Sequence, residues 1–480
     1  MAARIVGRET EKRVLQSALD SREAELVAIH GRRRVGKTFL IREFFGEHIS
    51  FELTGVYRGS AAAQLRHFAE ALSTEHDPVS LPSPPPDWQE AFRRLRLFVE
   101  RSRKRRAKTV LFFDELPWLS SRRSGFLPAF EHFWNAWAVK QPHVVVVVCG
   151  SASAGMVQKV LNAKGGLHNR VTRRIRLEPF QLAEADAYLR SRGVRLSRYA
   201  VVELYAALGG VPYYLKQVER GESPSVAIDR ICFAQGGPLH DEFDKLYASL
   251  FEHAERHTKV IRTLARKRTG LTRSELMAAA ELTTGGRATT LTDELIESGF
   301  VLRMPQFGRE AKDAVYRVID EYSLFYLSFI ESFRGRGTDV WGAKRGSPAW
   351  RAWSGYAFEG ICIKHIASIK RALGIEAVET SESSWFHRPN AAADRGAQID
   401  LVIDRKDATI NLCEMKFSEG EFAVDKRYAA ELVQKRDVFR RATRTKKSLF
   451  TTLVTTMGLR ENDHSRSVVD KSLDLEALFR

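Results

Sequence analysis

One short segment decides the fold of the first part of the chain: Gly31-Arg32-Arg33-Arg34-Val35-Gly36-Lys37-Thr38. It follows an apolar stretch, Glu25–His30, and precedes a stretch with helical periodicity, Thr38–Phe45. The segment fits the pattern G-x-x-x-x-G-K-[ST], whose glycines let a loop wrap closely around phosphate oxygens. Backbone N–H groups and the helix N-terminus then face the phosphates. We therefore predict a P-loop between a buried strand and a helix.

The side chains of this loop have predicted roles in binding Mg·ATP. Lys37 is expected to neutralise β- and γ-phosphate oxygens, and the Thr38 hydroxyl is expected to be a Mg²⁺ ligand. The remaining predicted nucleotide contacts come from the same segment and the next residue: Gly31, Arg32, Arg33, Arg34, Val35, Gly36 and Phe39. The alternative is a chance Gly-Lys-Thr loop, which the strand and helix on either side disfavour.

A second apolar stretch, Val110–Phe113, is followed directly by Asp114 and Glu115. Asp114 is expected to hold the Mg²⁺ shell, and Glu115 is placed to polarise the attacking water, which requires a carboxylate beside the metal. Lys37, Asp114 and Glu115 are therefore the predicted catalytic residues of ATP hydrolysis. The alternative is a solvated acidic pair at the end of a strand.

A third apolar stretch, Val144–Cys149, leads to Ser151, which can touch the γ-phosphate or the water as a sensor, or simply cap a helix. Such apolar stretches separated by helices predict a parallel sheet covered on both faces. Three arginines follow, and one of them can stabilise transition-state charge. The candidates are Arg170, Arg173 and Arg174, with ordinary surface arginines as the alternative.

The P-loop, the acidic pair, Gly150-Ser151, the N-terminal Ile5–Glu9 and the turn Gly209–Tyr214 together resemble archaeal-type ATPases of the STAND/AAA+ division. The resemblance implies that the N-terminal residues and the turn of a helical lid lie beside adenine. The adenine-side residues would be Val6, Gly7, Arg8 and Pro212. A plain helix-breaking turn is the alternative for Pro212. The family usually adds a winged helix and a C-terminal domain of unknown function.

The middle of the chain has the element order of a winged helix. Helices are predicted at His257–Arg266, after the capping box Thr272–Glu275, and at Gly286–Ser298, followed by strands Phe300–Met304 and Ala314–Ile319. A recognition helix places its first residues in the major groove, and a wing can hold phosphates. The candidates are Arg287, Thr289, Thr290 and Thr292 on the helix, and Arg303, Arg309 and Lys312 on the wing.

The alternative is a winged helix that packs or contacts a partner protein. Three acidic residues on the same recognition helix, Asp293, Glu294 and Glu297, would repel DNA on their face. They favour this alternative over sequence-specific readout.

A candidate nuclease site lies within residues 398–417. A hairpin centred on Arg405–Ala408 would bring Asp400 beside Glu414, and Lys416 would share the face of Glu414. Two carboxylates can hold Mg²⁺, and an ammonium can stabilise charge on a phosphodiester. Upstream, Glu359 on a helix could complete the metal shell, and Gln434 lies on the next helix.

This pattern resembles the PD-(D/E)xK nuclease core, and the resemblance implies catalytic roles for Glu359, Asp400, Glu414 and Lys416, with Asp400 and Glu414 as metal ligands. Ile399 stands where the usual proline would be. The alternatives are a fold that binds nucleic acid without cutting it, and a solvated hairpin with an ordinary cross-strand Glu–Lys pair.

The bulk composition favours a cytoplasmic protein with a nucleic-acid partner. The 480 residues carry a net charge of +17, which favours a polyanion, and DNA is expected ahead of RNA. No apolar run is long enough to span a bilayer, no signal peptide is recognisable, and four scattered cysteines form no CxxC pair. We expect no membrane partner, and further copies of the chain are a candidate partner.

The predicted fold class is α/β: a P-loop NTPase parallel sheet with a helical lid, a winged helix and a C-terminal restriction-endonuclease-like α/β domain. The expected boundaries are 1–178, 179–245, 246–333 and 334–480, with Arg334–Gly346 as linker. In the last domain, helices are predicted over Trp353–Leu373 and Lys426–Ala442, and a strand over Ser448–Thr455. The expected function is an ATPase acting on nucleic acid, with Mg²⁺-dependent cutting by the C-terminal domain left open. The alternative is a STAND-type signalling switch whose C-terminal domain only binds a partner or nucleic acid.

Overall fold

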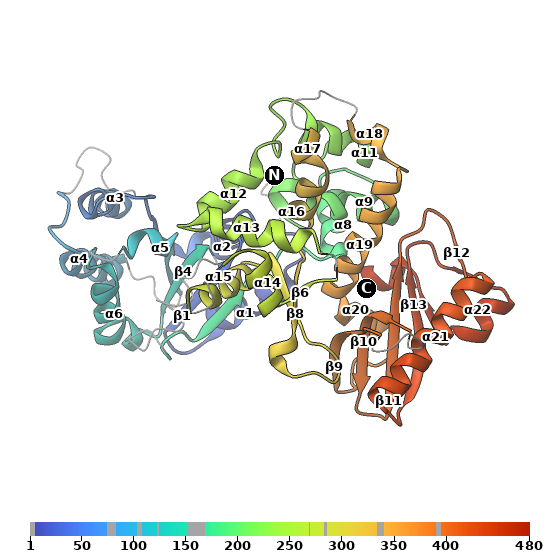
Figure 1. The fold of residues 1–480 in the computed structure, drawn as a ribbon. Coiled ribbons are helices and arrows are strands. Elements are labelled where there is room, and N and C mark those ends of the chain that lie inside the picture. Colours follow the sequence, from blue (N-terminus) through green and yellow to red (C-terminus); the bar gives the residue numbers. More distant parts are fainter. Residues whose placement is uncertain are drawn as a thin grey trace. The chain divides into compact units, whose positions relative to one another are not determined.

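The computed structural model describes residues 5–73, 83–102, 108–121, 124–151, 169–267, 269–282, 286–333, 340–389 and 395–480. The chain folds as two compact units, Met1–Pro179 and Phe180–Arg480. Figure 1 shows both, the first in blue to cyan and the second in green to red. Among the described residues, no helix is both long and apolar enough to cross a membrane.

The first unit is built on a five-stranded parallel sheet, as predicted. The strands are β1 (Glu25–Gly31), β2 (Ile49–Thr54), β3 (Thr109–Asp114), β4 (Val144–Ser151) and β5 (Arg173–Arg176). Their spatial order is β2-β3-β4-β1-β5, and every neighbouring pair is parallel. The sequence analysis missed β2 and β5, since both mix buried with partly or fully exposed residues and so lack the continuous apolar run of a central strand.

Helices cover both faces of this sheet, because alternate residues of each strand enter different apolar clusters. Leu111 and Phe113 pack with one set of helices, whereas Val110 and Phe112 pack with another. The first set contains α3 (Ala61–Ser73), α4 (Trp88–Ser102) and α6 (Phe126–Ala136), and the second contains α1 (Glu9–Asp20) and α2 (Lys37–Phe45). Short helices η1 (Gly46–His48), α5 (Leu116–Leu119) and η2 (Ala138–Lys140) complete the unit. The carboxyl ends of β1 and β3 therefore meet at one edge, where the predicted nucleotide residues lie.

The second unit begins with a group of helices. They are α8 (Leu182–Ser191), α9 (Arg198–Leu208), α10 (Pro212–Leu215), α11 (Pro224–Ile228), the π-helical turn η4 (Asp229–Phe233) and α12 (Glu242–Leu250). Two glycines shape the turn between α9 and α10. Gly209 has a φ of 67°, and a Cβ on Gly210 would lie 1.8 Å from the Phe180 carbonyl oxygen.

Three helices and a hairpin follow, close to their predicted positions. They are α13 (Ala254–Ala265), α14 (Arg273–Ala279), α15 (Gly286–Glu297), β7 (Val301–Met304), η5 (Ala311–Asp313) and β8 (Val315–Val318). The predicted capping box is present, because the Thr272 side chain accepts from the Glu275 backbone and Glu275 reaches back. A short strand that the sequence analysis missed, β6 (Leu271–Thr272), extends the hairpin to a three-stranded sheet.

A helical segment connects this hairpin to the C-terminal sheet. It comprises α16 (Glu321–Phe325), the π-helical turn η6 (Tyr326–Ile330), α17 (Glu331–Phe333), α18 (Val340–Lys344), α19 (Pro348–Lys364) and α20 (Ile366–Ala372). The expected linker is wrong over Val340–Lys344, which is helical, with Trp341 buried in the core; residues 334–339 lie outside the described part. The single helix predicted over Trp353–Leu373 is two helices, broken at His365.

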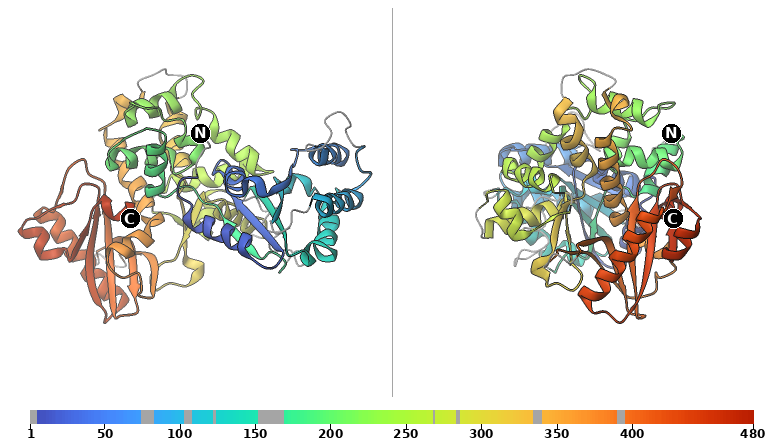
Figure 2. Two further views of the ribbon diagram at one scale, coloured as in Figure 1. Left: turned by 180° about the vertical axis from the view of Figure 1, so that it is seen from behind. Right: turned by 45° about the vertical axis from the view of Figure 1, so that its right-hand side comes forward.

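The C-terminal sheet is mixed. Its order is β15 (Lys471–Leu473), β13 (Ser448–Thr455), β11 (Thr409–Lys416), β10 (Ala397–Arg405) and β9 (Thr380–His387), with β10 antiparallel to both neighbours. Helices α19 and α20 pack on one face through Leu401 and Cys413, and α21 (Lys426–Thr443) packs on the other through Val402 and Leu412. The remaining elements are β12 (Phe422–Ala423), β14 (Leu459–Arg460), α22 (Asp463–Val468) and η7 (Leu475–Phe479). Figure 2 shows this sheet, in orange to red, from two further directions.

Candidate functional sites

The predicted P-loop is a tight turn between the end of β1 and the start of α2. Gly36 precedes α2 with a φ of 92°, a conformation that favours glycine. Gly31 is required for a different reason, since a Cβ there would lie 2.2 Å from the Leu177 carbonyl oxygen. Arg32 and Val35 are buried, whereas Arg33 and Phe39 are exposed. The loop therefore has the compact form that places backbone N–H groups at a helix N-terminus.

Lys37 is buried at the first position of α2, and its ammonium is held by the loop itself. The Nζ atom donates to the carbonyl oxygens of Gly31 and Arg32, both at 3.0 Å. No carboxylate forms an ion pair with this ammonium within the described part of the chain. Two hydrogen bonds to neutral carbonyls leave the positive charge of Lys37 available to an anion at the loop.

The two predicted ligands of a shared Mg²⁺ lie in contact. The Thr38 hydroxyl donates to Oδ2 of Asp114 at 2.6 Å, although the two residues are 76 positions apart in sequence. The other Asp114 oxygen, Oδ1, accepts from the backbone N–H of Glu115 at 2.9 Å. Adjacent hydroxyl and carboxylate oxygens are ligands that Mg²⁺ accepts. The separation of these side chains therefore fits one ion bound to both.

Glu115 is held in an unusual backbone conformation beside this pair. Its φ is 48° and ψ is 48°, a left-handed conformation that is uncommon for a residue with a side chain. Its Oε2 atom is buried and has no hydrogen-bond partner among the described residues. Burial raises the pKa of the Glu115 carboxyl, opposed by the positive charges of Lys37 and Arg33. A buried carboxylate oxygen of this kind can accept a proton from a water molecule.

Two further predicted residues lie against the loop. Ser151 is the last residue of β4 and pairs with Gly31, and its backbone hydrogen bond to Glu115 lowers the pKa of that carboxyl. Arg8 is buried and donates to the carbonyl oxygen of Val35 at 3.4 Å. Gly7 and Arg8 both have positive φ, so the chain turns sharply before α1. The half-buried Val6 precedes this turn.

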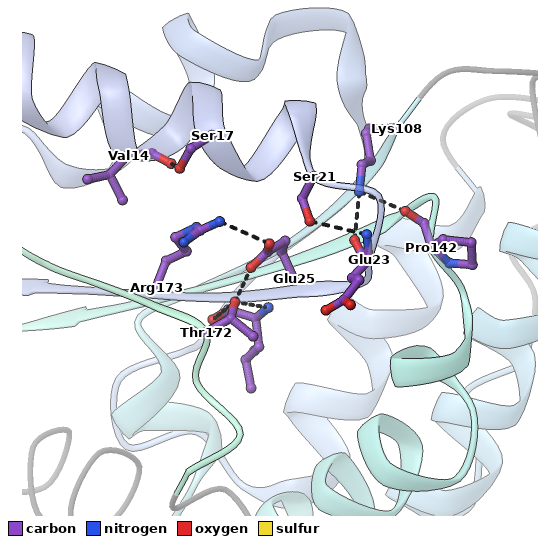
Figure 3. Close-up of polar contacts among 10 residues, drawn as sticks. Val14, Ser17, Ser21, Glu23, Glu25, Lys108, Pro142, Thr172 and Arg173 are labelled. Atoms are coloured by element: carbon purple, nitrogen blue, oxygen red, sulfur yellow. Dashed lines mark hydrogen bonds and ion pairs between the residues drawn. The ribbon is translucent and has the colours of Figure 1, made fainter.

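Two of the three predicted arginines, Arg170 and Arg173, lie away from this loop. Arg173 forms an ion pair with Glu25 at 3.2 Å, at the opposite end of β1, and Thr172 donates to the same carboxylate (Figure 3). Glu25 is six residues from Gly31, so this pair lies about 20 Å from the loop. Arg170 is exposed after β4. Arg173 therefore does not act at the loop of its own chain, because its guanidinium lies at the amino edge of the sheet, and a role for it in trans stays a prediction.

The sequence analysis missed a basic group at the carboxyl end of β1. Burial, together with the positive charges of Arg176, Arg174 and Lys37, lowers the pKa of His30 to about 4. His30 pairs with Arg176 across β1 and β5. The arginine-rich stretch before Leu177 could have predicted this basic group, but the sequence analysis did not recognise that the stretch forms strand β5 beside β1. A neutral imidazole and two arginines thus lie beside the P-loop.

The acidic cluster of the second unit brings the predicted nuclease residues into one region. Asp400 lies in an irregular part of β10, where its pairing with β9 shifts between Ile399 and Val402, and its Oδ2 accepts from the Met415 backbone at 3.1 Å. Glu414 on β11 is buried and accepts from Lys435 of α21 at 2.7 Å. A β-bulge of this kind often accompanies a functional site.

Each buried glutamate of this cluster has an internal cation. Glu359 on α19 accepts from Arg317 of β8 at 3.0 Å, and Glu414 also lies 3.8 Å from Lys416. Burial and the negative charge of Asp400 raise the pKa of Glu414 to about 7, against the opposing charges of Lys435 and Lys416. Burial also raises the pKa of Glu359, with Asp400 adding to the effect.

The expected three-carboxylate metal shell is not assembled. Among the described residues, no three His, Cys, Asp or Glu side chains gather closely enough to hold a metal ion. The physical reason is that Arg317 holds Glu359, whereas Lys435 holds Glu414 from the opposite face of the sheet. Two of the three carboxylates of the predicted shell are therefore held by internal cations in this structure, and Lys435 and Arg317 are functional candidates that the sequence analysis missed.

A cavity of about 560 Å³ opens beside this cluster. Its walls include Arg317, Asp400 and Lys435, together with Gln398 and Gln434. Gln434, predicted to lie near the site, donates to the carbonyl oxygen of Gly396 at 3.2 Å. The cavity therefore carries both signs of charge and side-chain amides, which suits a charged polar ligand.

The predicted recognition helix makes mostly internal contacts. Thr292 is buried and donates to the carbonyl of Ala288, so its predicted role at DNA is wrong. Thr290 donates to the carbonyl of Gly286, and Thr289 accepts from Arg273. The Arg287 side chain lies outside the described residues.

The predicted phosphate contacts on the hairpin remain exposed. Arg303 donates to the carbonyl of Ala311, and Lys312 pairs with Glu310 at 2.9 Å. Arg309 is exposed as well. Pro212, predicted to lie near adenine, is the first residue of α10 in the second unit, and that role stays a prediction.

Comparison with known proteins identifies a domain family over the first part of the chain. Residues 5–218 match a family described as an ATPase domain predominantly from Archaea. An uncharacterised protein of Methanocaldococcus jannaschii is 22% identical over 423 residues, covering 86% of this chain and 88% of the relative. The chain therefore carries an archaeal-type ATPase domain, and it is an ATP-hydrolysing enzyme.

Similar solved structures include two archaeal proteins. The Walker-type ATPase of Pyrococcus abyssi has a TM-score of 0.48 at 17% identity, covering 67% of this chain and 96% of its own. The ORC2 protein of Aeropyrum pernix, solved with ADPNP and ADP, has a TM-score of 0.40 at 14% identity, covering 71% and 94%.

Proposed function

We propose that this ATPase acts on nucleic acid, with Mg·ATP at the P-loop and the nucleic acid along the C-terminal part of the chain. The observation that carries the nucleotide site is the hydrogen bond of 2.6 Å between Thr38 and Asp114, next to Lys37. This contact supports the proposal because it brings the end of β3 against the first turn of α2, where phosphate oxygens are favoured.

The proposed roles at this site follow from the contacts. Lys37 binds β- and γ-phosphate oxygens, and Thr38 and Asp114 hold Mg²⁺, whose charge offsets that of the phosphates when the nucleotide is bound. Glu115 accepts the proton of the attacking water through its buried Oε2. Ser151 positions Glu115, and Arg8 supports the loop through Val35.

A basic surface on α21 supports the nucleic-acid part of the proposal. The helix and the turn after it carry exposed cations at Lys426, Arg427, Arg440, Arg441, Arg444 and Lys446. A groove of about 550 Å³ is lined by Arg395, Arg440 and Arg441, with one carboxylate, Asp437. Gln434 lines both this groove and the cavity beside the acidic cluster. Nucleic-acid phosphates that follow α21 would therefore be led toward Asp400.

The test is an ATPase assay with and without single- and double-stranded DNA. We expect DNA to raise the turnover rate several-fold, and the double variant Arg440→Gln/Arg441→Gln to lose that stimulation while keeping its basal rate. The matched control is Arg195→Gln/Arg220→Gln, which removes the same charge from exposed positions elsewhere in the unit. If both variants lose the DNA stimulation equally, the effect comes from total charge, and the proposal that the α21 surface binds nucleic acid is refuted.

The C-terminal domain is proposed to have a nuclease-like fold, in which Lys416 acts beside Asp400 and Glu414 in Mg²⁺-dependent cutting. A gel assay of plasmid nicking with Mg²⁺ or Mn²⁺ tests this role. We expect Lys416→Ala to abolish nicking while its ATPase rate is unchanged. If the unsubstituted protein leaves the plasmid intact with both metals, the nuclease proposal is refuted.

The second candidate function is a nucleotide-dependent switch whose C-terminal domain only binds. The ion pairs of Arg317 with Glu359 and of Lys435 with Glu414 favour it, because they neutralise carboxylates that a nuclease needs. Light scattering with ADP or an ATP analogue separates the two candidates. Assembly that follows the nucleotide, with an ATPase rate indifferent to DNA, would favour the switch.

A further inference from the structure

Arg317 is a buried cation that reaches out of its own small sheet. It lies on β8, its side chain is 5% exposed, and its Nη2 donates to Glu359 at 3.0 Å. The guanidinium also lies 5.1 Å from the centre of the Tyr356 ring. Both partners belong to α19, which packs on the C-terminal sheet. The contact therefore connects the β7–β8 hairpin to the acidic cluster.

The backbone around Arg317 is shaped to allow this reach. Gly270 has a φ of 82°, and a Cβ there would lie 2.8 Å from Cγ of Arg317 and 3.0 Å from the carbonyl oxygen of Tyr316. A side chain at position 270 would therefore push Arg317 from its place. The absence of a side chain at Gly270 therefore leaves room for the Arg317 side chain.

The hairpin also docks on β9 through backbone hydrogen bonds. Ser384 donates to the carbonyl of Pro305 and accepts from the N–H of Phe307, both at 2.9 Å. The Phe307 ring packs against Phe439 of α21 at 5.0 Å between centroids. These contacts make the position of Arg317 part of a built interface within the second unit.

The charges of the acidic cluster are balanced without any ion from outside. Among its buried and half-buried groups, the carboxylates are Glu359, Asp400 and Glu414, and the cations are Arg317, Lys416 and Lys435. A fourth carboxylate, the exposed Glu431, lies 3.4 Å from Lys435 at the edge of the cluster. Adding a divalent cation to a balanced cluster leaves excess positive charge in a partly buried site, which is unfavourable. Adding a phosphate diester at the same time would reduce that excess.

Arg317 is the cation of this set that lines the cavity and is held by a carboxylate of α19. A guanidinium has a planar fork of donors that fits a phosphate as well as a carboxylate. A phosphate in the cavity can therefore take Arg317 from Glu359, and Glu359 then becomes available to a cation.

We propose that Arg317 is a latch on the acidic cluster: it withholds Glu359 from divalent cations until a phosphate diester in the adjoining cavity binds its guanidinium. The proposal rests on the proposed role of the C-terminal domain on nucleic acid. It makes cation binding and phosphate binding mutually dependent. The metal shell missing from the isolated chain is then completed only with substrate.

The test measures Mn²⁺ binding to the full chain by electron paramagnetic resonance, without nucleotide. An Asp114→Asn background removes the metal ligand of the first unit. We expect Arg317→Met to bind Mn²⁺ at least about tenfold more tightly than its parent. The control Arg351→Met makes the same change at an exposed position of α19, and we expect no gain. Adding Glu359→Gln to Arg317→Met should remove the gain.

A short phosphorothioate DNA, which resists cutting, tests the phosphate arm. It should tighten Mn²⁺ binding by the parent about fivefold or more, and it should add little to Arg317→Met. Unchanged Mn²⁺ affinity in a folded Arg317→Met protein would overturn the latch. So would equal tightening by the DNA in both proteins.

A thermal-unfolding scan shows whether each variant is folded. Should Arg317→Met fail to fold, Arg317→Lys keeps the charge but loses the planar fork, and a gain of about threefold is expected. No gain in a folded Lys variant overturns the latch. If Arg317→Met binds Mn²⁺ more tightly but no protein nicks plasmid, the latch is supported and the nuclease proposal is refuted. If the unsubstituted protein nicks plasmid but Arg317→Met binds Mn²⁺ no more tightly than its parent, the nuclease proposal stands and the latch is refuted.

Discussion

The P-loop edge of the first unit and the acidic cluster of the second contain similar side chains in opposite states. Both combine carboxylates with a lysine near the end of a strand. In the first, within the part of the chain that the structure describes, the Lys37 ammonium is held by carbonyl oxygens alone and Oε2 of Glu115 has no hydrogen-bond partner. In the second, Glu359 and Glu414 are each bound by a buried or half-buried cation, Arg317 or Lys435.

This difference teaches that residue types alone do not define a site that is ready for a ligand. Charges that are held by neutral groups keep their attraction for an outside ion, whereas charges that are paired internally have largely lost it. The first site therefore has the form of a binding site in the isolated chain. The second has the form of a stabilising ion-pair network until something displaces a cation.

The largest expected effect is that of Lys37→Ala. The variant should lose at least about 100-fold in ATPase rate, because it removes the buried ammonium that the loop carbonyls hold at the start of α2. Its melting temperature should hardly change, since only two hydrogen bonds to carbonyls are lost. Lys140→Ala, an exposed lysine of the same unit, is the control. A normal rate in Lys37→Ala would refute the nucleotide site.

Glu115→Gln tests the buried carboxylate beside the loop. The amide keeps the size of the side chain but cannot take a proton, so turnover should fall about 100-fold while a fluorescent ATP analogue still binds. Single-turnover kinetics separates these two effects. Normal hydrolysis by this variant would mean that Glu115 only shapes the turn at the end of β3.

Lys435→Met asks whether the second lysine serves folding, in contrast to Lys37. It leaves Glu414 buried without its hydrogen bond of 2.7 Å, so we expect a loss of about 3 kcal/mol in the unfolding free energy of the second unit. Denaturant titration followed by tryptophan fluorescence measures it. Lys37→Ala serves as the matched lysine. If Lys435→Met and Lys37→Ala change the unfolding free energy equally, the conclusion that only Lys435 serves folding is wrong.

The smallest expected effect is a pH dependence that comes from Glu414. Its pKa is about 7 in the folded chain, against an ordinary value of 4.5, so the folded state keeps a proton that the unfolded state has released. Stability from this group is therefore present below about pH 4.5 and is lost as the pH rises to about 7. Glu414→Gln should flatten the fall in melting temperature over that range. The exposed Glu421→Gln, whose carboxylate lies 3.7 Å from Arg460, should not.

Much of the local structure was predictable because local patterns specify it. The strand Ser448–Thr455 has the predicted bounds, and α21 extends only one residue beyond its predicted end at Ala442. The capping box at Thr272 and Glu275 is present as predicted, since both of its hydrogen bonds lie within four residues.

Elements without a continuous local signal were missed. Strands β2 and β5 mix exposed and buried residues, and the break between α19 and α20 has no glycine or proline to mark it. His365 at that break accepts from the N–H of Leu182, 183 residues away, while its other ring nitrogen contacts the carbonyl of Ile361. A helix break supported by so distant a partner leaves no local pattern to recognise.

By itself, the sequence determined the strand–loop–helix that carries the phosphate-binding loop and the hairpin that carries Asp400 and Glu414, because glycine geometry and apolar periodicity act over a few residues. Only the tertiary structure decided which cation meets which carboxylate. Thr38 reaches Asp114 across the sheet, and Arg317 reaches Glu359 from another sheet. Ion pairs depend on distance in space, and that distance exists only once the elements have packed.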